Sequence, residues 1–127
     1  MKAFLIDPKK RSIKLVEYNN TLEHLYELLD CRMVDFVQAY GNADGMYVDD
    51  EGLFVEDQYF FHHINVPTPI AGRALIVGTD EEGNTVEADT SVEELHRHVT
   101  FIGDRQTLAT LMNWTSELYN ATAEGHA

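Results

Sequence analysis

The chain has 127 residues, 44% of them hydrophobic, and its 9 Lys and Arg against 22 Asp and Glu give a formal net charge of −13. That length suits one compact domain with a real core and is too short for two. The charge excludes ordinary electrostatic binding of the whole molecule to nucleic acid or to an anionic membrane surface.

The first part of the chain predicts a β-hairpin followed by a helix. Residues 2–6 and 12–18 have the alternating, β-branched pattern of strands, and Asp7–Arg11 between them has turn chemistry. Asn20 or Thr21 is expected to cap a helix. Its apolar residues recur at helical spacing and predict one buried stripe: Leu22, Leu25, Tyr26, Leu28 and Leu29.

The middle of the chain predicts further strands separated by glycine-rich or acidic turns. We expect them, in chain order, at residues 32–40, 46–48, 53–55, 73–78 and 85–88. Residues 58–66 are aromatic and are predicted to be irregular, and residues 67–72, with two prolines and a glycine, are predicted to form a loop.

The last part of the chain predicts two helices. Ser91 and Glu94 form a capping-box pattern that opens a short helix, and Val92, Leu95 and Val99 are expected inside it. Gly103–Asp104 introduces a final helix over about residues 105–119, whose inner face is expected to hold Leu108, Leu111, Met112, Thr115, Leu118 and Tyr119.

Together these elements predict the α+β class, with a mixed, largely antiparallel sheet packed with two to three helices. Residues 1–120 are expected to form a single domain and residues 121–127 a flexible tail. No apolar run approaches the ~20 residues that a membrane-spanning helix needs. A single cysteine, Cys31, fits a reducing compartment, so we expect a cytoplasmic protein with no membrane partner.

One glycine-rich turn comes near a calcium-binding pattern. Counting from Tyr40, the acids, amide and glycine of an EF-hand loop are matched by Asn42, Asp44, Gly45 and Glu51. Tyr40 supplies no carboxylate, however, and the flanks read as strands where an EF-hand needs helices. A hairpin turn is therefore the favoured interpretation, and we predict no metal and no cofactor.

The histidines and the cysteine give no standard catalytic arrangement. His62 and His63 are adjacent, and His96 and His98 are two residues apart, so neither pair converges on one point within a regular element. Cys31 follows a predicted helix without a local activating signal, and a small buried side chain is the favoured interpretation. Nucleotide-binding and hydrolase motifs are absent, so we predict no catalytic residues.

The aromatic segment is the most unusual stretch of the chain. Five consecutive residues, Tyr59, Phe60, Phe61, His62 and His63, cannot all point into one core from a regular strand. They are therefore predicted to present aromatic surface to a partner, a small ligand or a second copy of the chain, with Arg73 nearby as a cation for an anionic ligand. A loop that folds these side chains over the end of the sheet is the alternative.

The charges are segregated along the chain. Residues 1–14 hold five basic residues and one acid, a charge of +4, so the remainder carries −17. Two acidic turns stand out in long stretches without a basic residue, and we predict that they bind a partner: Asp49, Asp50 and Glu51, and Asp80, Glu81 and Glu82.

Four segments, taken together and in this order, resemble a domain family of unknown function: Lys2–Pro8, Ile13–Tyr18, Tyr47–Leu53 and Pro69–Gly78. Its members are small proteins of bacteriophages, plasmids and other mobile elements. The resemblance covers about residues 1–102 and leaves the last helix as an addition. It implies an α+β domain of accessory mobile-element type and offers no established catalytic residues to carry over.

We expect a non-enzymatic acidic interaction protein of phage or mobile-element type, in a host cytoplasm if viral. Acidic turns imitate a row of phosphates, so an anti-defence inhibitor or DNA mimic acting on a host nucleic-acid-binding protein is the leading hypothesis. A binder that sequesters a nucleotide signal and a metal-dependent enzyme are the alternatives. An acidic, lysine-poor surface is also typical of proteins from saline habitats.

Overall fold

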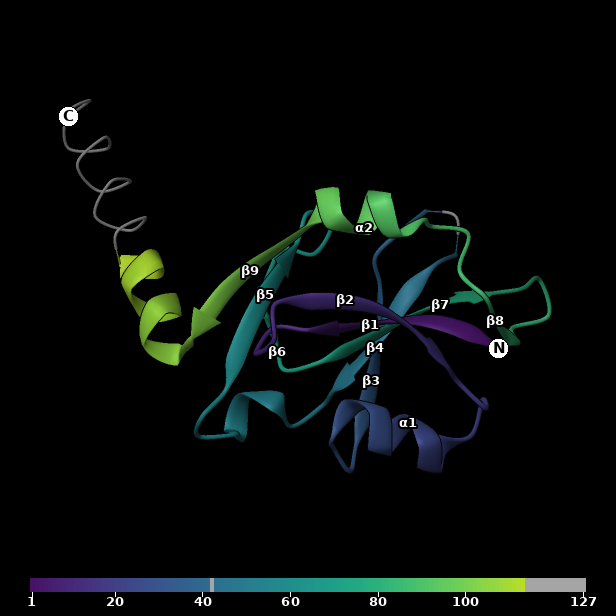
Figure 1. Ribbon diagram of the computed structural model, residues 1–127, viewed down its shortest axis with the longest axis horizontal. Helices are drawn as coiled ribbons and strands as arrows, with labels where there is room; N and C mark the ends of the chain where they lie inside the picture. The colour runs from purple at the N-terminus through teal and green to yellow at the C-terminus, as the bar shows by residue number, and fades with distance from the viewer. Residues whose placement is uncertain (42, 114–127) are drawn as a thin grey trace.

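The computed structural model describes residues 1–41 and 43–113, which form an α+β domain in three layers (Figure 1). A central antiparallel sheet has the strand order β2-β1-β7-β4-β3, and a short strand, β8, pairs with β7. The bounds are β1 Lys2–Asp7, β2 Ser12–Glu17, β3 Val34–Gln38, β4 Gly45–Asp49, β7 Ala74–Thr79 and β8 Thr85–Val86. The predicted N-terminal hairpin is confirmed, as is the α+β class.

Strand β7 lies at the centre of this sheet, and its apolar residues contribute to the core on both faces. Leu75 and Val77 point to one face, and Ala74 and Ile76 point to the other. Strands β1 and β4 flank it, so that Phe4, Ile76 and Met46 stand in one row across three strands. A continuous apolar run is typical of a strand that is covered on both sides.

Helix α1 (Leu22–Leu29) covers one face of the central sheet, at the bottom of Figure 1. Its side chains Leu25 and Leu29 are buried against Leu75 and Val77 of β7. Thr21 begins the helix as predicted, since its hydroxyl accepts a hydrogen bond from the backbone N–H of His24 at 3.2 Å.

The third layer, a small antiparallel sheet and a short helix, covers the other face of the central sheet. Its strands, in the order β6-β5-β9, are β5 Tyr59–His63, β6 Ile70–Ala71 and β9 Val99–Asp104, and the helix is α2 Val92–His98. Phe61, Leu95 and Val99 bury their side chains against Ile76 and Met46. Ser91 begins α2 as predicted, because its hydroxyl accepts from Glu94 N–H and donates to the Glu94 carboxylate.

Four segments differ from the sequence-based expectation. Residues 67–72, predicted to be a loop, contain the short strand β6, which pairs with β5. Residues 58–66, predicted irregular, contain β5, and β9 was not anticipated. Residues 53–55, predicted to be a strand, lie in and after a 3₁₀ turn, Gly52–Phe54, and pair with no strand in the described part of the chain. Gln58 closes this turn with a 2.7 Å hydrogen bond from its Nε2 to the Gly52 carbonyl.

The final helix is present over residues 105–113, but it points away from the domain (Figure 1). Its expected inner face is not buried, since Leu111 is 47% and Met112 is 58% exposed. The residues Thr115, Leu118 and Tyr119 and the tail 121–127 lie outside the described residues. Within residues 1–41 and 43–113, no helix is long and apolar enough to cross a membrane.

Candidate binding groove

Two adjoining hollows of about 400 and 310 Å³ open at the end of the sheet where β4 finishes and β7 starts. They share Asp30, Asp49 and Val55, and we call them together the acidic groove. Its walls come from the turn after β1, the end of α1, the end of β4, the segment after the 3₁₀ turn, and the starts of β5 and β7. The lining residues are Asp7, Pro8, Lys9, Leu29, Asp30, Cys31, Arg32, Asp49, Glu51, Phe54, Val55, Asp57, Gln58, Tyr59, Gly72 and Arg73.

Carboxylates outnumber cations in the acidic groove. Five acids line it, against Lys9, Arg32 and Arg73. Two of these cations are paired within the groove, Arg32 with Glu51 and Arg73 with Asp7, and the ammonium of Lys9 lies 6.0 Å from the centre of the Tyr59 ring. The acids left without an ion pair among the described residues are Asp30, Asp49 and Asp57. The groove therefore presents net negative charge.

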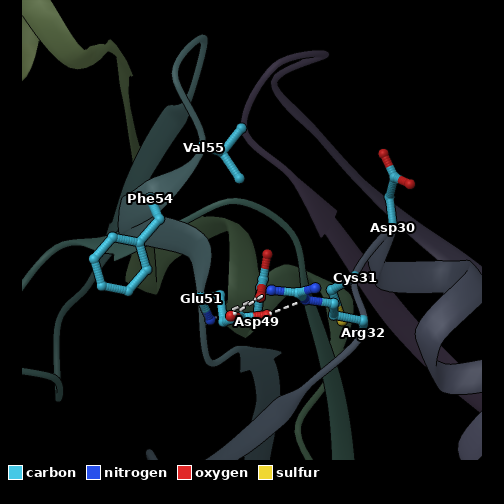
Figure 2. Close-up of a pocket in the computed structure, with 7 residues that line it drawn as sticks. All are labelled: Asp30, Cys31, Arg32, Asp49, Glu51, Phe54 and Val55. Atoms are coloured by element: carbon cyan, nitrogen blue, oxygen red, sulfur yellow. Dashed lines mark hydrogen bonds and ion pairs between the residues drawn. The ribbon is translucent and has the colours of Figure 1, made fainter.

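An apolar rim borders the groove and faces the solvent. Phe54 is 84% exposed, and its neighbours Leu53 and Val55 are exposed as well. The backbone here is fixed, because the Arg105 guanidinium donates 2.8 Å hydrogen bonds to the carbonyls of both Leu53 and Val55. Figure 2 shows Phe54 and Val55 on one side of the hollow, with Asp30 and Arg32 on the other. A loop held by Arg105 therefore presents three adjacent apolar side chains to water.

Arg32 and Glu51 form a two-pronged ion pair within the groove. Arg32 Nε lies 2.7 Å from Glu51 Oε1, and Nη2 lies 3.0 Å from Oε2 (Figure 2). The hydrogen bonds to Arg32 lower the pKa of the Glu51 carboxyl, and the same bonds raise the pKa of Arg32. The Glu51 backbone N–H also donates to Asp49 Oδ1 at 2.9 Å, so both carboxylates are held in place.

Cys31 lines the same hollow beside these acids. Burial raises the pKa of its thiol to about 11, and the negative charge of Asp49 adds to the effect. The thiol is therefore protonated at neutral pH, which makes it a poor nucleophile.

Arg73 does not stand free for an anionic ligand. Its Nε lies 3.6 Å from Asp7 Oδ2, and its Nη1 donates to the Leu28 carbonyl near the end of α1 at 3.2 Å. A cation at the carbonyl end of a helix stabilises that end. These contacts make Arg73 a link between β7, the β1–β2 turn and α1.

The structure divides the predicted acidic residues between two ends of the sheet. Asp49 and Glu51 line the groove, and Asp50 lies beside them with an exposed side chain. The turn of Asp80, Glu81 and Glu82 lies at the opposite end, because β4 and β7 are antiparallel. The length of β7 separates the two turns by roughly 20 Å, so they do not form one patch.

The predicted display of aromatic surface is wrong for three of its five residues. Phe60, Phe61 and His63 are completely buried, while Tyr59 and His62 are half-buried. The pairing of β5 with β9 shifts register between Phe60 and Phe61. The partners change from Gly103 to Phe101, so the extra residue, Ile102, belongs to β9. Successive residues of a strand point to opposite faces, so the burial of both Phe60 and Phe61 means that both faces of β5 are covered here.

Buried His63 belongs to a polar cluster that the sequence did not indicate. The Tyr40 hydroxyl lies 2.8 Å from His63 Nε2 and 2.9 Å from His98 Nδ1. Burial lowers the pKa of His63 to about 4, and His98 and His62 add to the effect. Burial also raises the pKa of Tyr40 to about 12, with smaller contributions from Glu94 and Asp44. This cluster joins β5 to the end of α2.

The carboxylate of Asp44 is buried and holds the loop before α2. It accepts hydrogen bonds from the Thr90 hydroxyl at 2.6 Å, Thr90 N–H at 2.8 Å and Asp89 N–H at 3.2 Å. In the part of the chain that the structure describes, no three His, Cys, Asp or Glu side chains are arranged to hold a metal ion.

Sequence reasoning missed Asp30, Asp57 and the apolar rim as groove residues. Asp30 follows α1 in a left-handed conformation, with φ of 51°, which turns the chain into the groove. The available signal for the rim was the apolar run Leu53–Val55, one glycine after three acids, which the pattern assigned to a strand.

The fold and the groove together define a small α+β domain with an open, acidic, apolar-rimmed hollow at one end of its central sheet. The chain belongs to the family described as a domain of unknown function, DUF3846, whose model matches residues 1–100. It is 24% identical over 98 residues to the uncharacterized protein y4iR of Sinorhizobium fredii (strain NBRC 101917 / NGR234). That alignment covers 76% of this chain and 60% of the relative, so the chain spans less than two thirds of that protein. No solved structure matches the chain.

Proposed function

We propose that this domain is a non-enzymatic interaction module whose acidic groove binds a basic segment of a partner protein. Apolar side chains of that segment pack on the rim of Leu53, Phe54 and Val55. One observation carries the proposal: Phe54, 84% exposed, stands beside a groove with an excess of carboxylates.

The apolar rim and the carboxylates of the groove contribute differently to binding. Covering one large apolar side chain contributes about 1.5–3 kcal/mol, and exposed aromatic residues are frequent centres of binding energy. The carboxylates Asp30, Asp49 and Asp57 add selectivity and speed of association, because a negative groove attracts lysine and arginine. A segment with both basic and apolar residues matches both features.

The class of partner that suits this groove is a basic, nucleic-acid-binding protein of a host cell, since such proteins carry exposed lysine and arginine. In this proposal the domain is an accessory protein of phage or mobile-element type that inhibits a host defence. The separation of the two acidic turns favours capture of one segment in the groove over imitation of a long row of phosphates.

A fluorescence-anisotropy titration of the full chain tests the proposal. The probes are short labelled peptides of arginine and leucine, of arginine and serine, and of glutamate and leucine, each measured at low and high salt. We expect the arginine–leucine peptide to bind best and to weaken as salt rises. Equal binding of the arginine–serine peptide would contradict the role of the rim.

A pair of triple variants with equal charge separates the groove from the overall charge. The first, Asp30→Asn with Glu51→Gln and Asp57→Asn, neutralises three acids in the groove. The matched variant neutralises three exposed acids elsewhere: Glu81→Gln with Glu82→Gln and Glu93→Gln. We expect the groove variant to lose most of the binding and the matched variant to keep it. Equal losses would show attraction by net charge alone and would contradict the groove.

A further inference from the structure

Arg32 is the one basic residue among those lining the larger hollow of the groove. Its side chain is 84% exposed, yet its guanidinium is held by both oxygens of Glu51, whose side chain is 30% exposed. The cation therefore lies within the groove as a long, exposed side chain bound to a less exposed carboxylate.

The carboxylate that holds Arg32 has the geometry of a guanidinium site. The two parallel N–H···O bonds, at 2.7 and 3.0 Å, use the planar fork of arginine, which the ammonium of lysine cannot reproduce. Asp49 fixes the Glu51 backbone by accepting its N–H, and its own negative charge also favours a cation here.

We propose, on the basis of the proposed function, that Glu51 and Asp49 form a subsite for an arginine of the partner segment, and that Arg32 occupies this subsite until the partner displaces it. Arg32 is then an autoinhibitory contact, and the subsite selects arginine over lysine. The displacement is easy because an exposed ion pair contributes little free energy. The partner also gains contacts with Phe54 and Asp30 that Arg32 does not make.

Two single variants that remove equal charge test this contact. Arg32→Ala removes the competing side chain, and Arg97→Ala removes an exposed arginine on α2, outside the groove. Each protein is titrated with the arginine–leucine peptide and with its lysine–leucine counterpart. We expect Arg32→Ala to bind the arginine peptide roughly two- to fivefold more tightly than Arg97→Ala, as loss of one exposed pair implies.

Glu51→Gln supplies the second arm, because it keeps the shape of the side chain but removes the bidentate carboxylate. We expect it to bind the arginine and lysine peptides equally, whereas the wild type prefers arginine. Equal affinity of Arg32→Ala and Arg97→Ala, or arginine preference retained in Glu51→Gln, would overturn the subsite. If wild type binds the arginine–leucine peptide but these differences are absent, only the proposed subsite is contradicted. If no variant binds either peptide, the proposed function is contradicted as well.

Discussion

The hydroxyl of Tyr40 accepts a hydrogen bond from His63 Nε2 at 2.8 Å and lies 2.9 Å from His98 Nδ1, so that one oxygen joins two histidines from different elements. The direction follows from the far side of His63, whose Nδ1 accepts the backbone N–H of Asn65 at 3.1 Å. That nitrogen has no proton, so Nε2 carries it. The neutral form of His63 is therefore the one that the folded protein requires.

Removing the Tyr40 hydroxyl should destabilise the domain. Tyr40→Phe leaves His63 Nε2 buried without its acceptor, and an unsatisfied buried polar group costs about 1–3 kcal/mol. Chemical denaturation followed by circular dichroism measures the free energy of unfolding. Tyr47→Phe is the matched control, since its hydroxyl makes a longer, partly buried contact of 3.3 Å with Thr85. An equal effect of both changes would contradict the role given to the cluster.

The buried neutral histidine also predicts a loss of stability in acid. The pKa of His63 is about 4 when folded and 6.5 ordinarily, so between these values the unfolded chain binds a proton that the folded protein does not. The free energy of unfolding that depends on neutral His63 is fully present above pH 6.5 and is lost as the pH drops towards 4. The loss amounts to roughly 3 kcal/mol over that interval.

The measurement is the free energy of unfolding from pH 7 to 4, compared between variants. His63→Gln should reduce the slope over this interval, because it removes the titrating group. His96→Gln, on the exposed side of α2, should keep the wild-type slope. Identical slopes in all three proteins would show that other groups control the acid response.

The buried carboxylate of Asp44 predicts a large effect from a small change. Asp44→Asn keeps the size of the side chain but weakens its bonds to the Thr90 hydroxyl and N–H, at 2.6 and 2.8 Å. Hydrogen bonds to a charged group contribute about 1.5–3 kcal/mol, so we expect a loss of that order in unfolding free energy. Asp89→Asn, an exposed acid next in the loop, should change stability by less than about 0.5 kcal/mol. A neutral result for Asp44→Asn would mean that the loop is held by other contacts.

The exposed rim predicts a separation of stability from binding. Phe54→Ser should leave the free energy of unfolding within about 0.5 kcal/mol of wild type, because the side chain is already in water. The same variant should weaken binding of the arginine–leucine peptide. Phe60→Ala, in the core, should cost about 3–5 kcal/mol. A large loss of stability in Phe54→Ser would show that the ring packs on the domain.

The raised pKa of Cys31, about 11, predicts slow alkylation near neutral pH and a rate that keeps rising as the pH increases past 9. Mass spectrometry of the iodoacetamide adduct measures that rate. Because Cys31 lines the groove, saturating arginine–leucine peptide should slow the alkylation further. A glutamate–leucine peptide is the control and should leave the rate unchanged.

The sequence predicted the elements whose signals are local. The turn after β1, the hydroxyl caps of Thr21 and Ser91, and the apolar run of β7 each depend on neighbouring residues, and all are confirmed. Strand β5 was missed because both of its faces are covered and its pairing partner β9 lies about forty residues away along the chain. Asp49 and Glu51 were predicted to bind a partner, and they lie in the groove. Asp30 and Asp57 were missed, since only the folded chain brings them beside Val55.

Arg105 joins the first turn of the last described helix to a loop more than forty residues earlier, through the carbonyls of Leu53 and Val55. Its guanidinium also lies 5.4 Å from the centre of the Phe60 ring. One side chain thus fastens three segments, which should open together rather than separately in amide hydrogen exchange. A partner that binds the helix at residues 105–113 would then affect the loop that carries Phe54, without contacting Phe54 itself.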